Sequence, residues 1–176
     1  TKDIIGAVPD DFVCMTNTPD SMLYDMAYRK ILLDAGPEYS VAATKTFTAS
    51  CMKLCGLVEP MAKQINDLMK RSSVIKDIAK RIMGYDHFLF LGDRQNYPIA
   101  LEGGLKFKEV AYVHAEGMPA SEMKHGPIAL VDYKVPSLFV VTEDFRLETI
   151  SNIKEIRSRR GFVVIITHDA ICDKLE

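Results

Sequence analysis

Three charged residues within the segment 97–113 are spaced so that they share one side of a helix. Glu102, Lys106 and Glu109 stand at positions i, i+4 and i+7, and residues three or four apart are neighbours on a helix surface. This line is either a solvated surface with two ordinary ion pairs or a site in which a carboxylate moves a proton beside a positive charge. The adjacent pair Gly103–Gly104 lowers helix propensity and favours a face packed closely against another backbone or a ligand.

The segment between residues 113 and 131 is dense in titratable side chains and interrupted by glycine and proline, so we expect a loop rather than core. His125 stands directly before Gly126-Pro127, and an imidazole with a pKa of about 6.5 passes protons in both directions at neutral pH. His125 is thus either a surface residue or an acid–base group. His114 and Glu116 form an HxE pattern, but no cysteine pair or second histidine follows at helix spacing, so we expect no metal.

The composition is that of a globular chain whose partners are small molecules or proteins. The 176 residues are 48% hydrophobic and 26% charged, which excludes the disordered and fibrous classes. The net charge of −2 at pH 7 gives no field that would draw the chain to nucleic acid or to an anionic membrane. The apolar runs have strand length, far short of the roughly 20 residues that a membrane helix needs. We expect neither nucleic acid nor membrane as a partner.

The cysteines and the amino-terminal residues favour the cytoplasm. Cys14, Cys51, Cys55 and Cys172 show no CxxC spacing, so neither a zinc site nor a disulfide framework is predicted. The first residues, Thr-Lys-Asp-Ile-Ile, lack the basic segment and apolar core of a secretory signal. We expect a cytoplasmic protein with reduced thiols and no cofactor.

Apolar runs that alternate with helical patterns predict a parallel sheet. Short apolar runs at 12–15 and 30–33 predict two buried strands. A helical stretch over 41–70 is expected to break near Gly56 and Pro60. The elements expected after it are helix 73–83, strand 87–91, helix 97–113, strand 137–142, helix 144–160 and strand 162–167. This alternation favours right-handed crossovers, and hence an α/β class with a doubly wound parallel sheet.

Two long, ordered motifs cover much of the chain. One runs over 97–117 and continues as Glu-Met-Lys-His-Gly-Pro-Ile-Ala-Leu at 122–130. The other joins Ala-Gly-Pro-Glu at 35–38 to Val-Ala-Ala-Thr-Lys-Thr-Phe-Thr at 41–48. Together they resemble the sugar isomerase (SIS) domain of the glucosamine-6-phosphate synthases, the glutamine:fructose-6-phosphate amidotransferases. The resemblance implies a flavodoxin-like SIS fold.

The resemblance also implies a domain organisation. Residues 1–57 then represent a remnant of a first SIS subdomain. Residues 58–176 represent a second SIS subdomain whose carboxy-terminal part is missing.

The resemblance further implies the conversion of fructose 6-phosphate and glutamine-derived ammonia to glucosamine 6-phosphate. Glu109 then matches the carboxylate that moves a proton between C1 and C2, His125 matches the histidine that assists ring opening, and Lys106 matches the lysine that supports the enediol-like charge. Such an isomerisation needs a base, an acid–base pair at the ring oxygen and a positive group beside the intermediate's oxygen. The expected substrate contacts are Val41, Ala42, Ala43, Thr44 and Glu102.

Partners follow from the same resemblance. A hexose phosphate is the expected substrate, a glutaminase domain is expected in the full-length protein, and a homodimer is expected in which His125 serves the neighbouring subunit's site. The family's Ser- and Thr-rich phosphate loop does not precede the strand at 12–15, and Ala43 stands where the family carries a sugar-contacting serine. Each difference removes hydrogen bonds to the ligand. The chain alone is therefore expected to bind hexose phosphates weakly or not at all.

Two other functions remain open from the sequence. A stand-alone SIS-type sugar-phosphate deaminase or deglycase shares the motif at 41–45. A non-catalytic module that binds a phosphosugar and regulates a partner is favoured by the missing phosphate loop. Glu109 and His125 argue against that module, because binding alone requires no proton shuttle. A glutaminase domain encoded upstream would favour the synthase.

Overall fold

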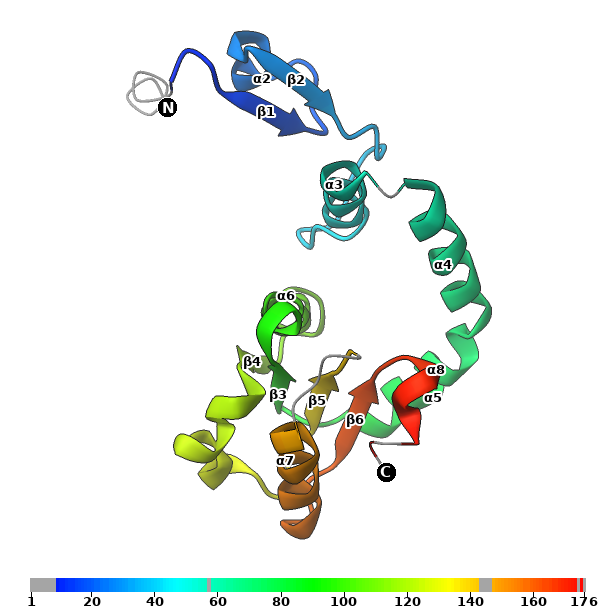
Figure 1. Cartoon of the computed structure of the whole chain (residues 1–176), viewed down its shortest axis with the longest axis vertical. Helices are drawn as coiled ribbons and strands as arrows, with labels where there is room; N and C mark the ends of the chain where they lie inside the picture. Colours follow the sequence, from blue (N-terminus) through cyan, green and yellow to red (C-terminus); the bar gives the residue numbers. More distant parts are fainter. Residues whose placement is uncertain (1–8, 57, 143–146, 174, 176) are drawn as a thin grey trace. The chain divides into compact units, whose positions relative to one another are not determined.

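The computed structural model describes residues 9–56, 58–142, 147–173 and 175 (Figure 1). The chain divides into two compact units, Thr1–Val74 and Ile75–Glu176, and each unit has its own sheet. This division lies at Val74, later in the chain than the boundary at residue 57 that the resemblance implied. No helix among the described residues is long and apolar enough to cross a membrane.

The first unit contains two parallel strands followed by helices. Its elements in chain order are β1 (Val13–Thr16), α2 (Met22–Met26), β2 (Arg29–Leu32), α3 (Lys45–Cys55) and α4 (Val58–Lys70). The strands pair in parallel from Val13 opposite Arg29 to Thr16 opposite Leu32. These strands confirm the prediction made from the two apolar runs. Two parallel strands need a connection that crosses from the end of one to the start of the other, and α2 lies in this connection.

The long helical stretch predicted over 41–70 is two helices. α3 ends at Gly56, whose φ of 67° is the left-handed conformation that glycine adopts without strain. Pro60 does not interrupt a helix, because it lies in the first turn of α4, where a missing N–H removes no intrahelical hydrogen bond. The expected break is therefore confirmed at Gly56 and was wrong at Pro60.

The second unit is a doubly wound parallel sheet. Its elements are α5 (Ser72–Ile82), which begins at the end of the first unit, then β3 (His87–Gly92), α6 (Tyr97–Lys106), β4 (His114–Met118), β5 (Ser137–Val140), α7 (Leu147–Ser158), β6 (Val163–Ile166) and α8 (Asp169–Cys172). The strand order is β4-β3-β5-β6, and all three pairings are parallel. The first strand of the unit is thus flanked by the second and the third, which is the flavodoxin-like arrangement.

Helices cover both faces of this sheet. Successive side chains of β3 point to opposite faces, so Leu89 and Leu91 join one buried cluster while Phe88 and Phe90 join another. The first cluster includes Ile153 and Ile156 of α7, and the second includes Ala100 of α6 and Ile82 of α5. Burial on both faces explains why these strands are continuous apolar runs rather than alternating ones.

The segment 113–131 is not the loop that we expected. His114–Met118 forms the edge strand β4, and Ala120–His125 and Pro127–Leu130 form two 3-10 helices, η3 and η4. Its sequence, His-Ala-Glu-Gly-Met, hides the strand because only Ala115 and Met118 are buried. Pairing with β3, rather than apolar character, holds this strand in the sheet.

Two predicted helices differ from the observed ones at their ends. The helix predicted over 97–113 is α-helical only to Lys106 and continues as a π-helical turn, η2 (Phe107–Ala111), which ends where Tyr112 adopts a φ of 57°. The helix predicted over 144–160 is α7, and its expected start at 144 lies outside the described residues. The other predicted strands and helices of this unit are confirmed within two residues at each end.

We predict that Gly117→Ala destabilises the second unit. A Cβ at Gly117 would lie 2.7 Å from Cα of Leu101 and 2.9 Å from the carbonyl oxygen of Ala100, and backbone atoms cannot give way as a flexible side chain can. We expect a loss of about 1–3 kcal/mol, as for other overpacked sites. Urea unfolding measures it.

Gly104→Ala is the matched control for this prediction. Its Cβ would lie 3.3 Å from the backbone nitrogen of Gly117, a tight contact that a shift of a few tenths of an ångström relieves, and the higher helix propensity of alanine offsets this cost. The stability of this variant should stay within about 1 kcal/mol of the parent. Equal stability of the two variants would show that the separation between α6 and β4 is adjustable.

Candidate functional site

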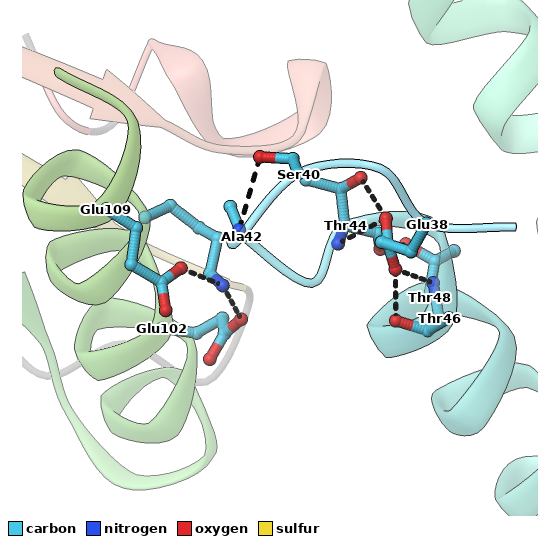
Figure 2. A network of polar contacts seen from close by, with 9 residues as sticks. Glu38, Ser40, Ala42, Thr44, Thr46, Thr48, Glu102 and Glu109 are labelled. Carbon is cyan, nitrogen blue, oxygen red and sulfur yellow. Dashed lines mark hydrogen bonds and ion pairs between the residues drawn. The ribbon is translucent and has the colours of Figure 1, made fainter. Parts of the chain in front are cut away.

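Lys106 lies between two carboxylates at the carboxy-terminal end of α6 (Figure 2). Its Nζ is 2.5 Å from Oε2 of Glu109 and 3.4 Å from Oε1 of Glu102. The side chains of the three residues are only 22–24% exposed. The predicted shared face is therefore confirmed, and its burial distinguishes it from a solvated line of surface ion pairs.

The two carboxylates act on the protonation of Lys106. Its hydrogen bond to Glu109 raises the pKa of Lys106 above the ordinary value of 10.5; partial burial opposes this rise, and hydrogen bonding to Glu102 adds to it. Lys106 is therefore an ammonium throughout the neutral range. The cluster provides a fixed positive charge in contact with a carboxylate, which is the pairing that proton transfer next to a developing oxyanion requires.

Backbone geometry places Glu109 beside Lys106. Lys106 is the last residue of α6, and Glu109 is the third residue of the π-helical turn η2. The N–H of Phe107 at the junction is shared between the carbonyl oxygens of Gly103 and Gly104. Single π turns within helices occur often at functional sites, because they shift the direction of the side chains that follow.

A second polar network in the first unit is centred on Glu38 (Figure 2). One carboxylate oxygen accepts hydrogen bonds from the backbone N–H of Thr44 at 3.2 Å and from its hydroxyl at 3.0 Å. The other accepts from the N–H of Thr46 at 3.2 Å and from its hydroxyl. Thr44 is the N-cap of α3, and its own side chain makes no capping bond. Glu38 therefore caps this helix from six residues upstream.

The hydrogen bonds to Glu38 stabilise its ionised form. The hydroxyl of Thr46 contributes most to lowering the pKa of Glu38 from 4.5 to about 2; burial works in the opposite direction, and Thr44 adds to the lowering. A carboxylate at a helix N-terminus is also favoured by the helix dipole. This role of Glu38 was not predicted from the sequence. An acidic residue followed by two threonines at a helix start was the available signal.

The expected substrate-contacting residues of the first unit form the loop between Glu38 and α3. Ser40 Oγ accepts a hydrogen bond from the N–H of Ala42 at 3.2 Å, and this turns the chain. Ala42 is buried, whereas Val41, Ala43 and Thr44 are exposed. The loop thus presents backbone and small side chains on a frame held at both ends by hydrogen bonds.

His125 is an exposed residue at the end of η3. Gly126, which follows it, has a φ of 146°, a conformation that L residues rarely adopt, so the chain turns sharply behind the imidazole. The ion pairs described for Lys106 in this unit are with Glu102 and Glu109, and His125 takes part in neither. The structure therefore brings together three of the expected site residues and leaves His125 outside them.

Among the residues that the structure describes, no three histidine, cysteine or acidic side chains gather as a metal-binding group. The polar clusters described above use their carboxylates for other partners. Glu102 and Glu109 pair with Lys106, and Glu38 accepts hydrogen bonds from threonines.

Comparison with known proteins places the site in a family. The model of the SIS domain matches residues 82–171, which is more than half of the chain and contains Glu102, Lys106, Glu109 and His125. The chain belongs to the SIS domain family. The parallel sheet of the second unit lies within the matched range, so the SIS assignment agrees with the strand order described above.

Curated relatives of this SIS chain are named glutamine–fructose-6-phosphate aminotransferase (isomerizing). The protein from Chlorobaculum tepidum is 40% identical over 157 aligned positions, and the match covers 77% of this chain and 26% of the relative. The protein from Methanosarcina acetivorans is 37% identical over 195 aligned positions, covering 94% of this chain and 32% of the relative. The SIS chain therefore spans about a quarter to a third of the length of these relatives.

A solved structure matches most of the SIS chain. The C-terminal domain of glucosamine-fructose-6-phosphate aminotransferase from Francisella tularensis superposes with a TM-score of 0.80 at 33% identity. The match covers 93% of this chain and 53% of that one. The fold prediction, a flavodoxin-like α/β SIS fold, is confirmed.

We predict that Glu38→Gln frays the start of α3. The amide keeps the size of the side chain but removes the charge that the threonine donors and the helix dipole stabilise. Backbone amides of Thr44 and Thr46 should exchange with solvent roughly five- to thirtyfold faster, as for the loss of a helix cap. Hydrogen exchange by NMR measures this, and Glu59→Gln in the first turn of α4 is the matched control.

The pH dependence of the same amides follows from the lowered pKa of Glu38. Because the pKa of Glu38 falls from 4.5 in the unfolded chain to about 2, its contribution to stability is complete above about pH 4.5. It is lost as the pH falls through about 2. Protection of Thr44 and Thr46 that disappears already near pH 4.5 would contradict the capping role.

Proposed function

We propose that the chain is part of the isomerase domain of a glutamine–fructose-6-phosphate aminotransferase, in which it acts on a hexose phosphate. The contact between Lys106 and Glu109, inside the SIS-matched segment, carries this proposal. The names of the relatives support it, with identities of 37–40% over most of the chain. Because the chain spans only part of those relatives, the whole reaction belongs to a larger protein.

The cluster supplies the chemistry for moving a proton between C1 and C2. Glu109 takes the proton from one carbon and returns it to the neighbouring carbon, because a single carboxylate can face both. The intermediate bears negative charge on an oxygen, and the Lys106 ammonium stabilises that charge from its place next to Glu109. Glu102 lies on the other side of Lys106, 3.4 Å from its Nζ, and in this proposal it also contacts the sugar. Partial burial strengthens each of these electrostatic interactions.

His125 assists opening of the sugar ring in this proposal. Its exposed imidazole lies outside the Lys106 cluster, so it acts in the site of a neighbouring subunit of a homodimer. The rigid turn at Gly126-Pro127 limits the positions that the imidazole can take. An imidazole can both protonate and deprotonate the ring oxygen at neutral pH.

The first unit contributes the sugar-contacting loop. In this proposal the loop offers backbone groups and one hydroxyl to the substrate through Val41, Ala42, Ala43 and Thr44. The hydrogen bonds of Ser40 and Glu38 hold the backbone of this loop where it enters α3. A glutaminase domain of the same full-length protein provides the ammonia. The cytoplasm is the proposed location, because the spacing of the four cysteines indicates no disulfide framework.

Glu109→Gln tests the assigned base. The amide keeps the shape of the side chain but cannot accept a carbon-bound proton, so C1 exchange should fall about 10²–10⁴-fold, the usual contribution of such a group. Hydrogen–deuterium exchange at C1 of fructose 6-phosphate is followed by NMR. The enzyme is a chimaera in which this chain replaces the matching segment of the Francisella tularensis aminotransferase.

Glu155→Gln is the control, since Glu155 is a half-exposed residue of α7 paired with Arg159. It should leave exchange unchanged. Full exchange by Glu109→Gln would remove Glu109 from the mechanism. A chimaera that lacks exchange before any substitution would contradict the proposed function itself.

Mixing two inactive chimaeras tests the shared site. One carries Glu109→Gln and the other His125→Ala, and each alone should lack activity. If His125 serves the neighbouring subunit, heterodimers contain one site with both native residues, and up to about a quarter of the activity should return on mixing. Mass spectrometry of the intact dimers checks that subunits exchange. Heterodimers without activity would place His125 and Glu109 in the same subunit's site.

A further inference from the structure

Phe107 anchors the π-helical turn to the sheet. Its ring packs edge to face against Phe88, with centroids 5.0 Å apart, and against Phe90, with centroids 4.8 Å apart. Both partners belong to β3 and are almost fully buried. Phe107 is the first residue of the turn, directly after Lys106 and two residues before Glu109. The ring therefore links the backbone between the two charged residues to the sheet.

Gly103 leaves the space that this arrangement needs. A Cβ at Gly103 would lie 2.7 Å from Cδ1 and from Cε1 of Phe90, so the ring of Phe90 occupies the position that a side chain would take. Phe90 in turn supports Phe107. The two carbonyl oxygens that share the N–H of Phe107 belong to Gly103 and Gly104. The glycine, the two rings and the start of the π turn thus form one contiguous contact.

We propose that Phe107, seated on Phe90 above Gly103, is the positioning residue that holds the Glu109 carboxylate against Lys106. The effect of Phe107 on catalysis rests on the proposed function. Its effect on the contact between Glu109 and Lys106 involves only residues of the second unit and does not depend on that function. Ion pairs between flexible side chains contribute little when their backbones are free to move. Here the ring fixes the backbone between the two charges, so their contact does not depend on the salt bridge alone.

The anchoring predicts a specific pattern of effects. Replacing the ring of Phe107 by a smaller side chain makes the turn more mobile. The Glu109 carboxylate is then in contact with the Lys106 ammonium for less of the time, although neither charged residue has changed. Adding a methyl group at Gly103 displaces Phe90 and loosens the seat of Phe107 from the other side. A purely structural role predicts lower stability with an intact ion pair, whereas a positioning role predicts a weaker ion pair in the folded protein.

The experiment follows the Lys106 ammonium group by NMR in the 176-residue chain. Hydrogen-bonded lysine ammonium groups exchange slowly enough to give a signal, so Lys106 should be visible and should disappear in Glu109→Gln, which assigns it. Phe107→Leu and Gly103→Ala should weaken or abolish that signal, while the backbone amide spectrum still shows a folded protein. Val110→Ala, an exposed position on the same turn, is the matched control and should keep it.

The same variants are measured in the chimaeric enzyme. We expect kcat for C1 exchange to fall roughly tenfold in Phe107→Leu, with KM changed less than twofold, because misplacing a reacting group affects the chemical step. Phe90→Leu should restore part of the loss in Gly103→Ala, since the smaller side chain makes room for the methyl group.

The outcomes separate the two proposals. An unaltered Lys106 signal in folded Phe107→Leu and Gly103→Ala overturns the positioning role of Phe107, whatever the activity. A chimaera without exchange before substitution overturns the proposed function, and the Lys106 signal still decides on positioning. If Phe107→Leu does not fold, Gly103→Ala and its double variant with Phe90→Leu decide between the two roles, since both retain the ring at 107.

Discussion

The close approach of α6 to the sheet is the constraint on which the site depends. Gly103, Gly104 and Gly117 have no side chains where the helix meets β3 and β4, and a methyl group at two of them would overlap neighbouring atoms. Three glycines in one contact lower the intrinsic stability of helix and strand. The same closeness lets the rings of β3 reach the end of α6, and there the helix opens into a π turn. The arrangement of the charges follows from backbone packing rather than from the charges themselves.

Charge compensation explains how three ionisable groups remain together with less than a quarter of their surface exposed. One ammonium between two carboxylates gives each charged group an opposite charge as a neighbour, and the cluster as a whole keeps one negative charge. The carboxylate of Glu38 in the first unit is also stabilised by its neighbours, here by four hydrogen-bond donors from two threonines. Both clusters combine ionised groups with fixed backbone, the combination on which electrostatic preorganisation relies.

The sequence predicted those features that depend on local periodicity. The spacing of Glu102, Lys106 and Glu109 was enough to predict their contact, because helix geometry relates positions four and seven apart. The π turn was not predicted, because the spacing of the charged residues does not distinguish it from a continued α-helix. The strand His114–Met118 was missed because it is held by pairing with β3 rather than by apolar character. Glu38 was missed because its role requires the loop before α3 to fold back onto the helix start.

The position of β6 at the edge of its sheet has a practical consequence. Among the residues that the structure describes, β6 pairs only with β5, and its four residues, Val163–Ile166, include neither a charge nor a proline. Ile166 is 52% exposed. Open apolar edges of this kind template pairing with other chains, and natural proteins usually protect them with lysine, proline or a bulge. Preparations of the isolated chain should therefore be kept dilute, because this edge can pair with the same edge of another copy.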